Sequence, residues 1–448
     1  MGKSKVSDPP CCQKYGVPLY GAAWAPRHIR SELLPKEPDQ ADDPVSGDES
    51  PPSDVIAANN YLVFAGGGGE GRSGIPNDVL LSQFDFVSNS LSDQPVAKLG
   101  LGSDLPYRMA VHPGGEGVIC ALPKSCRWFE WGKVKSSDIH TPCLKLSKKM
   151  LTDLEDIGQQ LSVTFNDEGS VLALGGEDGK LRVLKWPSME IILDQSDVYT
   201  AVKDLDFSPD GKFLASLGSG GPCRVWDATS STLVASLPKE NDEVFGFCRF
   251  SQNSNMNQVL YTTVMRGQGG SIVTWNTTSW KRIGSKQIVR DPVSAFNVSA
   301  DGKLLAIGTI QGDILIINST NMRAQTLIRK AHLGIVTTLA FSEDSRALAS
   351  ASMDSSARVT LILNKKNGML LCCFLIELVV LENIPLETGR VQIMDKVCCP
   401  NLGSVIAMKE PLKWPKCVQG IIDKLLAYLL ILYLHFITFI LYFSDQKL

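Results

Sequence analysis

Two stretches of the sequence determine the expected fold: LSVTFNDEGSVLALGGEDGKLRVLKW at residues 161–186 and VKDLDFSPDGKFLASLGSGGPCRVWD at residues 202–227. Each stretch reads as an apolar strand, a polar turn, a second apolar strand that ends in small residues, another turn and a third strand. The turn Pro209-Asp210-Gly211 is typical of a tight reversal between two strands. Both stretches therefore predict the same unit of short strands.

The unit recurs along the chain at a nearly constant spacing. Phe165, Phe207, Phe250, Val298 and Phe341 occupy equivalent positions, and they are 42, 43, 48 and 43 residues apart. A period of about 40–45 residues with four strands per unit is typical of a β-propeller. Two further units are expected upstream, one from residue 107 and one built from residues 15–25, 59–67 and 79–86. We therefore expect an all-β fold, a seven-bladed propeller in residues 15–363 after an N-terminal tail at 1–14.

The repeats are degenerate members of the WD-repeat class, because they contain a single Trp-Asp dipeptide, Trp226-Asp227. In the last unit, His332 precedes the first strand and Asp354 lies in a turn. We interpret both as structural residues that share a hydrogen bond inside a WD-type blade, and not as a catalytic pair. The histidines of the chain have no obvious carboxylate constellation, and no G-x-S-x-G elbow occurs, so a propeller hydrolase is a weak alternative.

Composition excludes several classes of protein. The chain has 448 residues, 44 Lys and Arg against 47 Asp and Glu, and a formal net charge of −3. This balance argues against a basic nucleic-acid binder, so no nucleic-acid partner is expected. The 12 Cys include adjacent pairs and no C-x-x-C spacing, and no secretory signal precedes them. We expect reduced, mostly buried thiols in a cytosolic domain, and no zinc site.

The C-terminal region predicts a membrane-anchored protein. Residues 425–443 read LLAYLLILYLHFITFILYF, a run of 19 residues that is long and apolar enough for a transmembrane helix. Lys413, Lys416 and Lys424 precede this run and Lys447 follows it, which places the propeller on the cytosolic side. The expected order is an irregular linker at 364–420, a single membrane anchor at 421–443 and a short lumenal tail at 444–448. A second apolar stretch, at 369–381, fits a buried strand, a membrane-surface segment or a damaged anchor.

The first unit contains an insert. Residues 31–54 hold five Pro and eight acidic residues against one Lys, which predicts a disordered, solvated loop. Such a loop could attract a basic partner, and it could equally be an inert surface excursion.

The most unusual string is AGGGGEGRSGIPN at residues 65–77. It nearly matches the phosphate-binding pattern G-x-x-x-x-G-K-S/T, with Arg72 in place of Lys, but that motif needs a helix directly after it. Here Gly74 and Pro76 follow, and then a β-type run, so a nucleotide site is rejected. A flexible hairpin is the simplest alternative, yet the loop is long for a hairpin. Its glycines allow backbone carbonyls to turn inward together, which suits a hard cation such as K+ or the close approach of a partner.

At these residues the sequence resembles the Sec12-like exchange factors, and the opening QKYGVPLYGAAW with its acidic insert is similar to the plant branch. The resemblance covers residues 13–363 and implies a guanine-nucleotide exchange factor at the endoplasmic reticulum membrane. Such a protein loads GTP onto the Sar-type small GTPase that starts COPII vesicle formation. The resemblance also implies a loop-bound K+ and a loop tip that touches the GTPase. The implied metal-binding residues are Gly66, Gly67, Gly68, Gly69, Gly71, Gly74 and Asn77, and the implied exchange residues are Ile75, Pro76 and Asn77.

The chain departs from that family after residues 356–359, since some sixty residues separate its last strand from the predicted anchor. The alternative function is a propeller scaffold at the endoplasmic reticulum that assists export of membrane cargo without exchange activity. Relatives of that kind lack the glycine-rich loop, so the presence of residues 66–77 favours the exchange function. We expect Asn77→Ala and Ile75→Asp to reduce exchange with little change in melting temperature, on the premise that the loop lies outside the core.

Overall fold

The computed structural model describes residues 9–26, 59–71, 73–136, 139–147, 154–240, 242–252 and 258–362, all within the first of two compact units, Met1–Cys372. The predicted acidic insert, the apolar stretch at 369–381, the linker, the anchor and the tail lie outside these residues. The described residues form strands and connecting turns without an α-helix.

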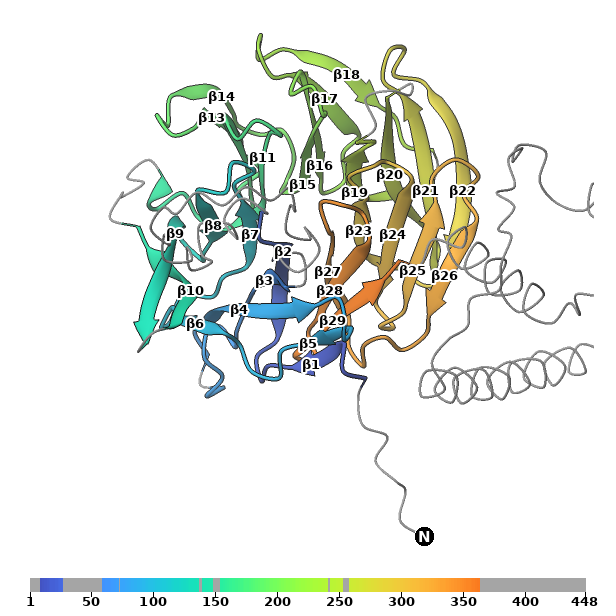
Figure 1. Ribbon diagram of the computed structural model, residues 1–448. Helices are drawn as coiled ribbons and strands as arrows, with labels where there is room; N and C mark the ends of the chain where they lie inside the picture. Colours follow the sequence, from blue (N-terminus) through green and yellow to red (C-terminus); the bar gives the residue numbers. More distant parts are fainter. Residues whose placement is uncertain are drawn as a thin grey trace, which may run out of the picture. The chain divides into compact units, whose positions relative to one another are not determined.

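The strands form seven sheets around a common axis, which confirms the predicted seven-bladed propeller (Figure 1). The first strand of each blade faces the axis, where residues of all seven such strands line a cavity of about 180 Å³. Neighbouring strands in a blade are antiparallel, and short polar turns join them.

The first four blades follow one another in the chain. Blade one contains β2 (Leu19–Trp24), β3 (Asn59–Gly66), β4 (Asp78–Asp85), β5 (Ser90–Leu91) and β6 (Ala97–Gly100), and both β5 and β6 pair with β4. Blade two contains β7 (Arg108–Val111), β8 (Gly117–Ala121), β9 (Cys126–Ser136) and β10 (Ile139–Leu146). Blade three contains β11 (Gln160–Phe165), β12 (Val171–Gly176), β13 (Leu181–Lys185) and β14 (Ile191–Gln195). Blade four contains β15 (Val202–Phe207), β16 (Phe213–Gly218), β17 (Cys223–Asp227) and β18 (Leu233–Leu237).

The last three blades complete the ring. Blade five contains β19 (Val244–Phe250), β20 (Val259–Arg266), β21 (Gly269–Asn276) and β22 (Arg282–Val289). Blade six contains β23 (Val293–Val298), β24 (Leu304–Thr309), β25 (Ile314–Asn318) and β26 (Ala324–Ile328). Blade seven takes β27 (Val336–Phe341), β28 (Ala347–Ser352) and β29 (Ser356–Leu361) from its own repeat and β1 (Cys12–Lys14) from the N-terminal region.

The N-terminal strand closes the ring. β1 pairs with β29, so that Cys12 lies opposite Arg358 and Lys14 opposite Ser356. The sequence places residues 1–14 in a tail, whereas the structure assigns Cys12–Lys14 to blade seven. Because the first and last strands of the propeller share one sheet, blade seven cannot separate from blade one without breaking a strand pair.

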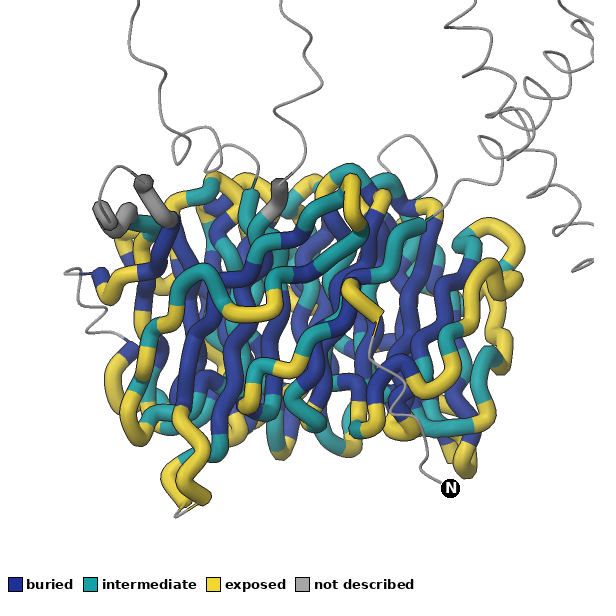
Figure 2. The backbone as a smooth tube through the Cα atoms, turned by 60° about the horizontal axis from the view of Figure 1, so that its bottom comes forward, coloured by how far each residue is buried: buried dark blue, intermediate teal, exposed yellow. Residues whose placement is uncertain are grey.

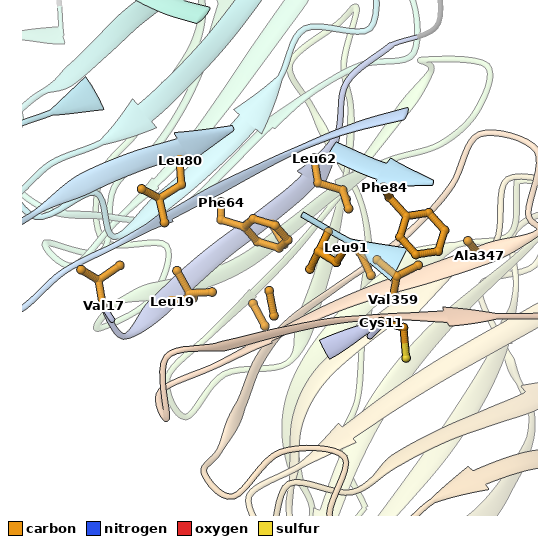
Figure 3. Close-up of a cluster of buried hydrophobic side chains, with 14 residues drawn as sticks. Cys11, Val17, Leu19, Leu62, Phe64, Leu80, Phe84, Leu91, Ala347 and Val359 are labelled. Atoms are coloured by element: carbon orange, nitrogen blue, oxygen red, sulfur yellow. The ribbon is translucent and has the colours of Figure 1, made fainter. Parts of the chain in front are cut away.

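A buried cluster joins blades one and seven at this closure (Figure 3). Phe64 and Phe84 of blade one pack in the same cluster as Val359 of blade seven and Cys11, which precedes β1. Burying a side chain of the size of Phe contributes roughly 1.5–3 kcal/mol relative to exposure, so the seam is a genuine part of the core.

The two faces of the propeller carry different connections. Strand direction places the turn between the second and third strands of every blade, and every connection between blades, on one face. We call this the loop face. The described residues that border the insert, near Pro26, and the last described residue, Ile362, lie on the opposite face. Figure 2 shows that exposed residues gather in the turns on the two faces, while buried residues occupy the strands between them.

His332 and Asp354 belong to one buried hydrogen-bond network in blade seven. His332 Nδ1 lies 2.5 Å from Ser356 Oγ, and its Nε2 lies 2.8 Å from Ser350 Oγ. Asp354 Oδ1 accepts a hydrogen bond from the Ser356 hydroxyl, and the His332–Asp354 separation is 4.0 Å. The two residues are therefore linked through Ser356 and not by the direct hydrogen bond expected from the sequence, while their structural role is as expected.

The described cysteines are also as expected. Each of these thiols is buried and outside a disulfide: Cys11, Cys12, Cys120, Cys126, Cys143, Cys223 and Cys248.

Candidate functional site

The glycine-rich loop, residues 67–77, joins β3 to β4 on the loop face of blade one, and its root is tightly packed. Gly66 ends β3 opposite Asp78, and the Gly67 N–H donates to the Pro18 carbonyl over 2.9 Å. A Cβ at Gly66 would lie 1.9 Å from Pro18 O, and one at Gly67 would lie 2.2 Å from Asn77 Oδ1. Only glycine therefore lets the root approach its neighbours this closely.

Asn77 fastens the two ends of the loop together. Its side chain is 2% exposed, and its Oδ1 accepts a hydrogen bond from the Gly69 N–H at 2.9 Å. Its Nδ2 donates to Gly69 O at 3.2 Å and to Gly102 O at 2.9 Å. The sequence-based premise that the loop lies outside the core is wrong for Asn77, because its amide is a buried bridge between the loop and the chain after β6.

The segment around β6 supports the loop, and the sequence gives little sign of this contact. β6 pairs with the start of β4, where Lys98 Nζ lies 2.8 Å from the buried carboxylate of Asp78. The Leu101 N–H donates to Asn77 O over 2.8 Å. The signal available in the sequence is an Asp at the head of the apolar run VLLSQFDF. Its partner stands twenty residues later, so no local pattern reveals the pair.

The tip of the loop faces solvent. Ile75 is 36% exposed, and Pro76 beside it is exposed as well. Gly71 and Gly74 are exposed, with open space where a side chain would project. The structure therefore divides the predicted site residues into two groups. Gly66, Gly67, Gly68, Gly69 and Asn77 form the packed root, while Gly71, Gly74, Ile75 and Pro76 form the displayed tip.

Uncharged oxygen atoms converge on the root. A point 1.5 Å from the Gly67 Cα, where a Cβ would stand, lies 2.2 Å from Asn77 Oδ1 and 2.8 Å from Pro76 O. The equivalent point at Gly68 lies 2.3 Å from Ser73 Oγ and 3.0 Å from Ile75 O. Carbonyl and hydroxyl oxygens without formal charge are the donors that suit a dehydrated K+. Pro76 O, Asn77 Oδ1, Ser73 Oγ and Ile75 O are donors of this kind, and the described residues hold no group of three or more His, Cys, Asp or Glu that could bind another metal.

The loop has the means to recognise a partner. Its root supplies neutral oxygens and its tip supplies an isoleucine and a proline, groups that bind ions or proteins and transfer no proton at neutral pH. The ring of blades itself defines a WD-type propeller. Within the described residues, the structure offers no helix with the length and apolarity that crossing a membrane requires.

Comparison with known proteins agrees with this class and narrows it. Residues 163–278 match the family described as "Anaphase-promoting complex subunit 4 WD40 domain", and residues 324–360 match "WD domain, G-beta repeat". The chain is 49% identical to SEC12-like protein 2 of Arabidopsis thaliana over 363 residues, which are 81% of this chain and 90% of that protein. It is 30% identical to SEC12-like protein 1 of the same plant, over 78% of this chain and 82% of that protein.

More distant relatives carry an explicit activity in their names. The chain is 24% identical to the guanine nucleotide-exchange factor SEC12 of Rattus norvegicus, over 71% of this chain and 91% of that protein. The chain belongs to the SEC12-like family.

Proposed function

We propose that the chain is a guanine-nucleotide exchange factor for a Sar-type small GTPase. In this role it promotes GDP release and GTP loading at the endoplasmic reticulum membrane and so starts COPII vesicle formation. The observation that carries the proposal is the loop at residues 67–77, with a root held by Asn77 and a tip that displays Ile75 and Pro76. Relatives named as SEC12 exchange factors support it.

Exchange of this kind needs no covalent chemistry. The propeller must bind the nucleotide-free GTPase more tightly than the GDP-bound form, and by linkage it then weakens nucleotide affinity by the same factor. Ile75 and Pro76 supply the apolar contact, and the packed root keeps them in place, which lowers the entropy cost of binding. K+, when bound, would be held by Pro76 O, Asn77 Oδ1 and neighbouring loop oxygens, and would stiffen the loop.

The test uses the purified full-length chain and a Sar-type GTPase loaded with fluorescent GDP. We expect the chain at micromolar concentration to accelerate GDP release, and to do so more strongly in K+ buffer than in Na+ buffer of equal ionic strength. Ile75→Asp should reduce the acceleration about tenfold or more, because a charge would be buried in the contact.

Val87→Asp is the matched control, since Val87 is 84% exposed on the opposite face. Full GTPase binding without acceleration by the wild-type chain would replace the exchange proposal with the scaffold function. Equal rates in the two buffers would remove K+ from the proposal and leave the exchange role in place.

A further inference from the structure

Exposed apolar side chains cluster beside the glycine-rich loop. The described residues include 13 exposed large hydrophobic side chains, and five of them lie in loops of the loop face on three adjacent blades. Ile75 belongs to blade one, and the other four are contributed by blades six and seven. We call the following residues the apolar patch: Ile310, Leu333, Ile335 and Met353.

The patch is continuous with the root of the loop. Gly67 donates to Pro18 O, and the next carbonyl, that of Leu19, accepts a hydrogen bond from Thr337 Oγ1 at 2.6 Å. Thr337 stands two residues after Ile335, and the Ile335 carbonyl accepts from the Met353 N–H at 3.2 Å. The backbone that carries the patch is therefore linked to the root of the loop by a short series of hydrogen bonds, on the same face of the propeller.

The most exposed member of the patch is held in place from behind. Leu333 is 76% exposed, yet its N–H donates to Asp354 Oδ2 over 2.7 Å. Asp354 is in turn fixed by Ser356, which also contacts buried His332. A large apolar side chain on a backbone that is already ordered loses little entropy on binding, which is typical of an interface anchor.

The size of a stable protein–protein interface indicates what binds the apolar patch. A stable protein–protein interface takes roughly 20–30 residues from each side, and the loop comprises only residues 67–77. A partner that binds the loop tip must cover neighbouring parts of the same face. On the side of blade seven, that neighbouring surface is the apolar patch.

We infer that Leu333, Ile335 and Met353, with Ile310 at the margin, form a second contact surface for the GTPase that engages the loop. The inference rests on the proposed exchange function and extends it to blades six and seven. The surface on the GTPase must itself be apolar, and the contact must be stronger in the nucleotide-free state in order to contribute to exchange.

The experiment measures release of fluorescent GDP from a Sar-type GTPase by the full-length chain. Leu333→Asp and Met353→Asp should each reduce the acceleration about tenfold or more, and Leu333→Ser, which adds no charge, should reduce it several-fold. Val87→Asp adds the same charge on the opposite face and should retain the wild-type rate. Melting temperatures identify any variant that fails to fold. If Leu333→Asp does not fold, the exchange rate of Leu333→Ser tests the inference in its place.

The outcomes separate this inference from the proposed function. An active wild-type chain whose three patch variants are equally active would overturn the second contact surface alone. A wild-type chain that neither binds the nucleotide-free GTPase nor releases GDP would overturn both. A wild-type dimer that Leu333→Asp converts to a monomer with full exchange activity would show that the patch binds a second copy of the chain, and the inference would again be wrong.

Discussion

Asn77 illustrates how one side chain can belong to both the fold and the site. Its amide makes two hydrogen bonds to Gly69 within the loop and one to Gly102 after β6, and it is buried at the root. The family resemblance of the loop motif identifies Asn77 as a site residue, together with Ile75 and Pro76. It cannot reveal the burial, because that depends on Gly102, which is 25 residues away.

The Asn77→Ala variant should lose stability as well as exchange activity. Removing the amide leaves the Gly69 N–H, Gly69 O and Gly102 O without this partner, which costs about 1–3 kcal/mol. Urea unfolding of the full-length chain measures the loss, with Ile75→Ser as a control at the exposed tip of the same loop. Equal unfolding midpoints for wild type and Asn77→Ala would mean that the bridge does not stabilise the folded state.

His332 should make the stability of the chain depend on pH. Burial lowers the pKa of His332 from 6.5 to about 4, against the opposing effect of the Asp354 carboxylate. Between these values the unfolded chain binds a proton at this residue and the folded chain does not, so stability falls as the pH falls from 6.5 to 4.

The matched variant is His332→Asn, which should be less stable than wild type at pH 7. The difference in unfolding free energy between the two should shrink by up to about 3 kcal/mol as the pH is lowered to 4, following the size of the pKa change. Urea unfolding at pH 7, 6, 5 and 4 provides the measurement. A constant difference across this range would show that His332 titrates alike in the folded and unfolded chains.

At the scale of elements, the repeats can be recognised in the sequence because the strands of each blade pack in the same way. Phe165 and Phe207 stand at the end of the first strand of their blades, and each is buried among the strands of its neighbours. Blade one is harder to read, since an insert separates β2 from β3 and the outer position is shared by β5 and β6. β1 has three residues and no alternating pattern, so nothing in its own sequence marks it as a strand.

Deleting residues 1–14 should destabilise the propeller strongly. The deletion removes the pairing of β1 with β29, the hydrogen bond from Val359 N–H to Cys11 O and the one from Leu91 N–H to Pro10 O. It also exposes the seam that Cys11 covers. We expect a loss of roughly 3–5 kcal/mol from these contacts together.

Thermal unfolding of the truncated and intact chains checks this expectation. Deletion of residues 1–8 is the control, because it leaves every one of these contacts in place. Similar melting temperatures for the two deletions would show that the ring closes without β1.

At the scale of the whole propeller, the two faces carry different features. The glycine-rich loop and the apolar patch lie on the loop face, whereas the acidic insert and the C-terminal extension leave the described chain on the opposite face. β3 has eight residues, so at about 3.3 Å per residue its ends lie about 23 Å apart. That separation is nearly three Debye lengths at physiological ionic strength, where the screening length is about 8 Å.

Replacing residues 31–54 with a neutral Gly-Ser linker of equal length should therefore leave exchange nearly unchanged at physiological salt. The eight acidic residues of the insert start from the face opposite the proposed GTPase contact, and their field is screened over the thickness of the propeller. At about 0.01 M ionic strength the screening length grows to about 30 Å, so any contribution of the insert to the association rate should appear there first. GDP release measured at both salt concentrations, with the wild-type insert as reference, gives the comparison. A loss of exchange at physiological salt would place the insert in the contact with the GTPase, despite its origin on the far face.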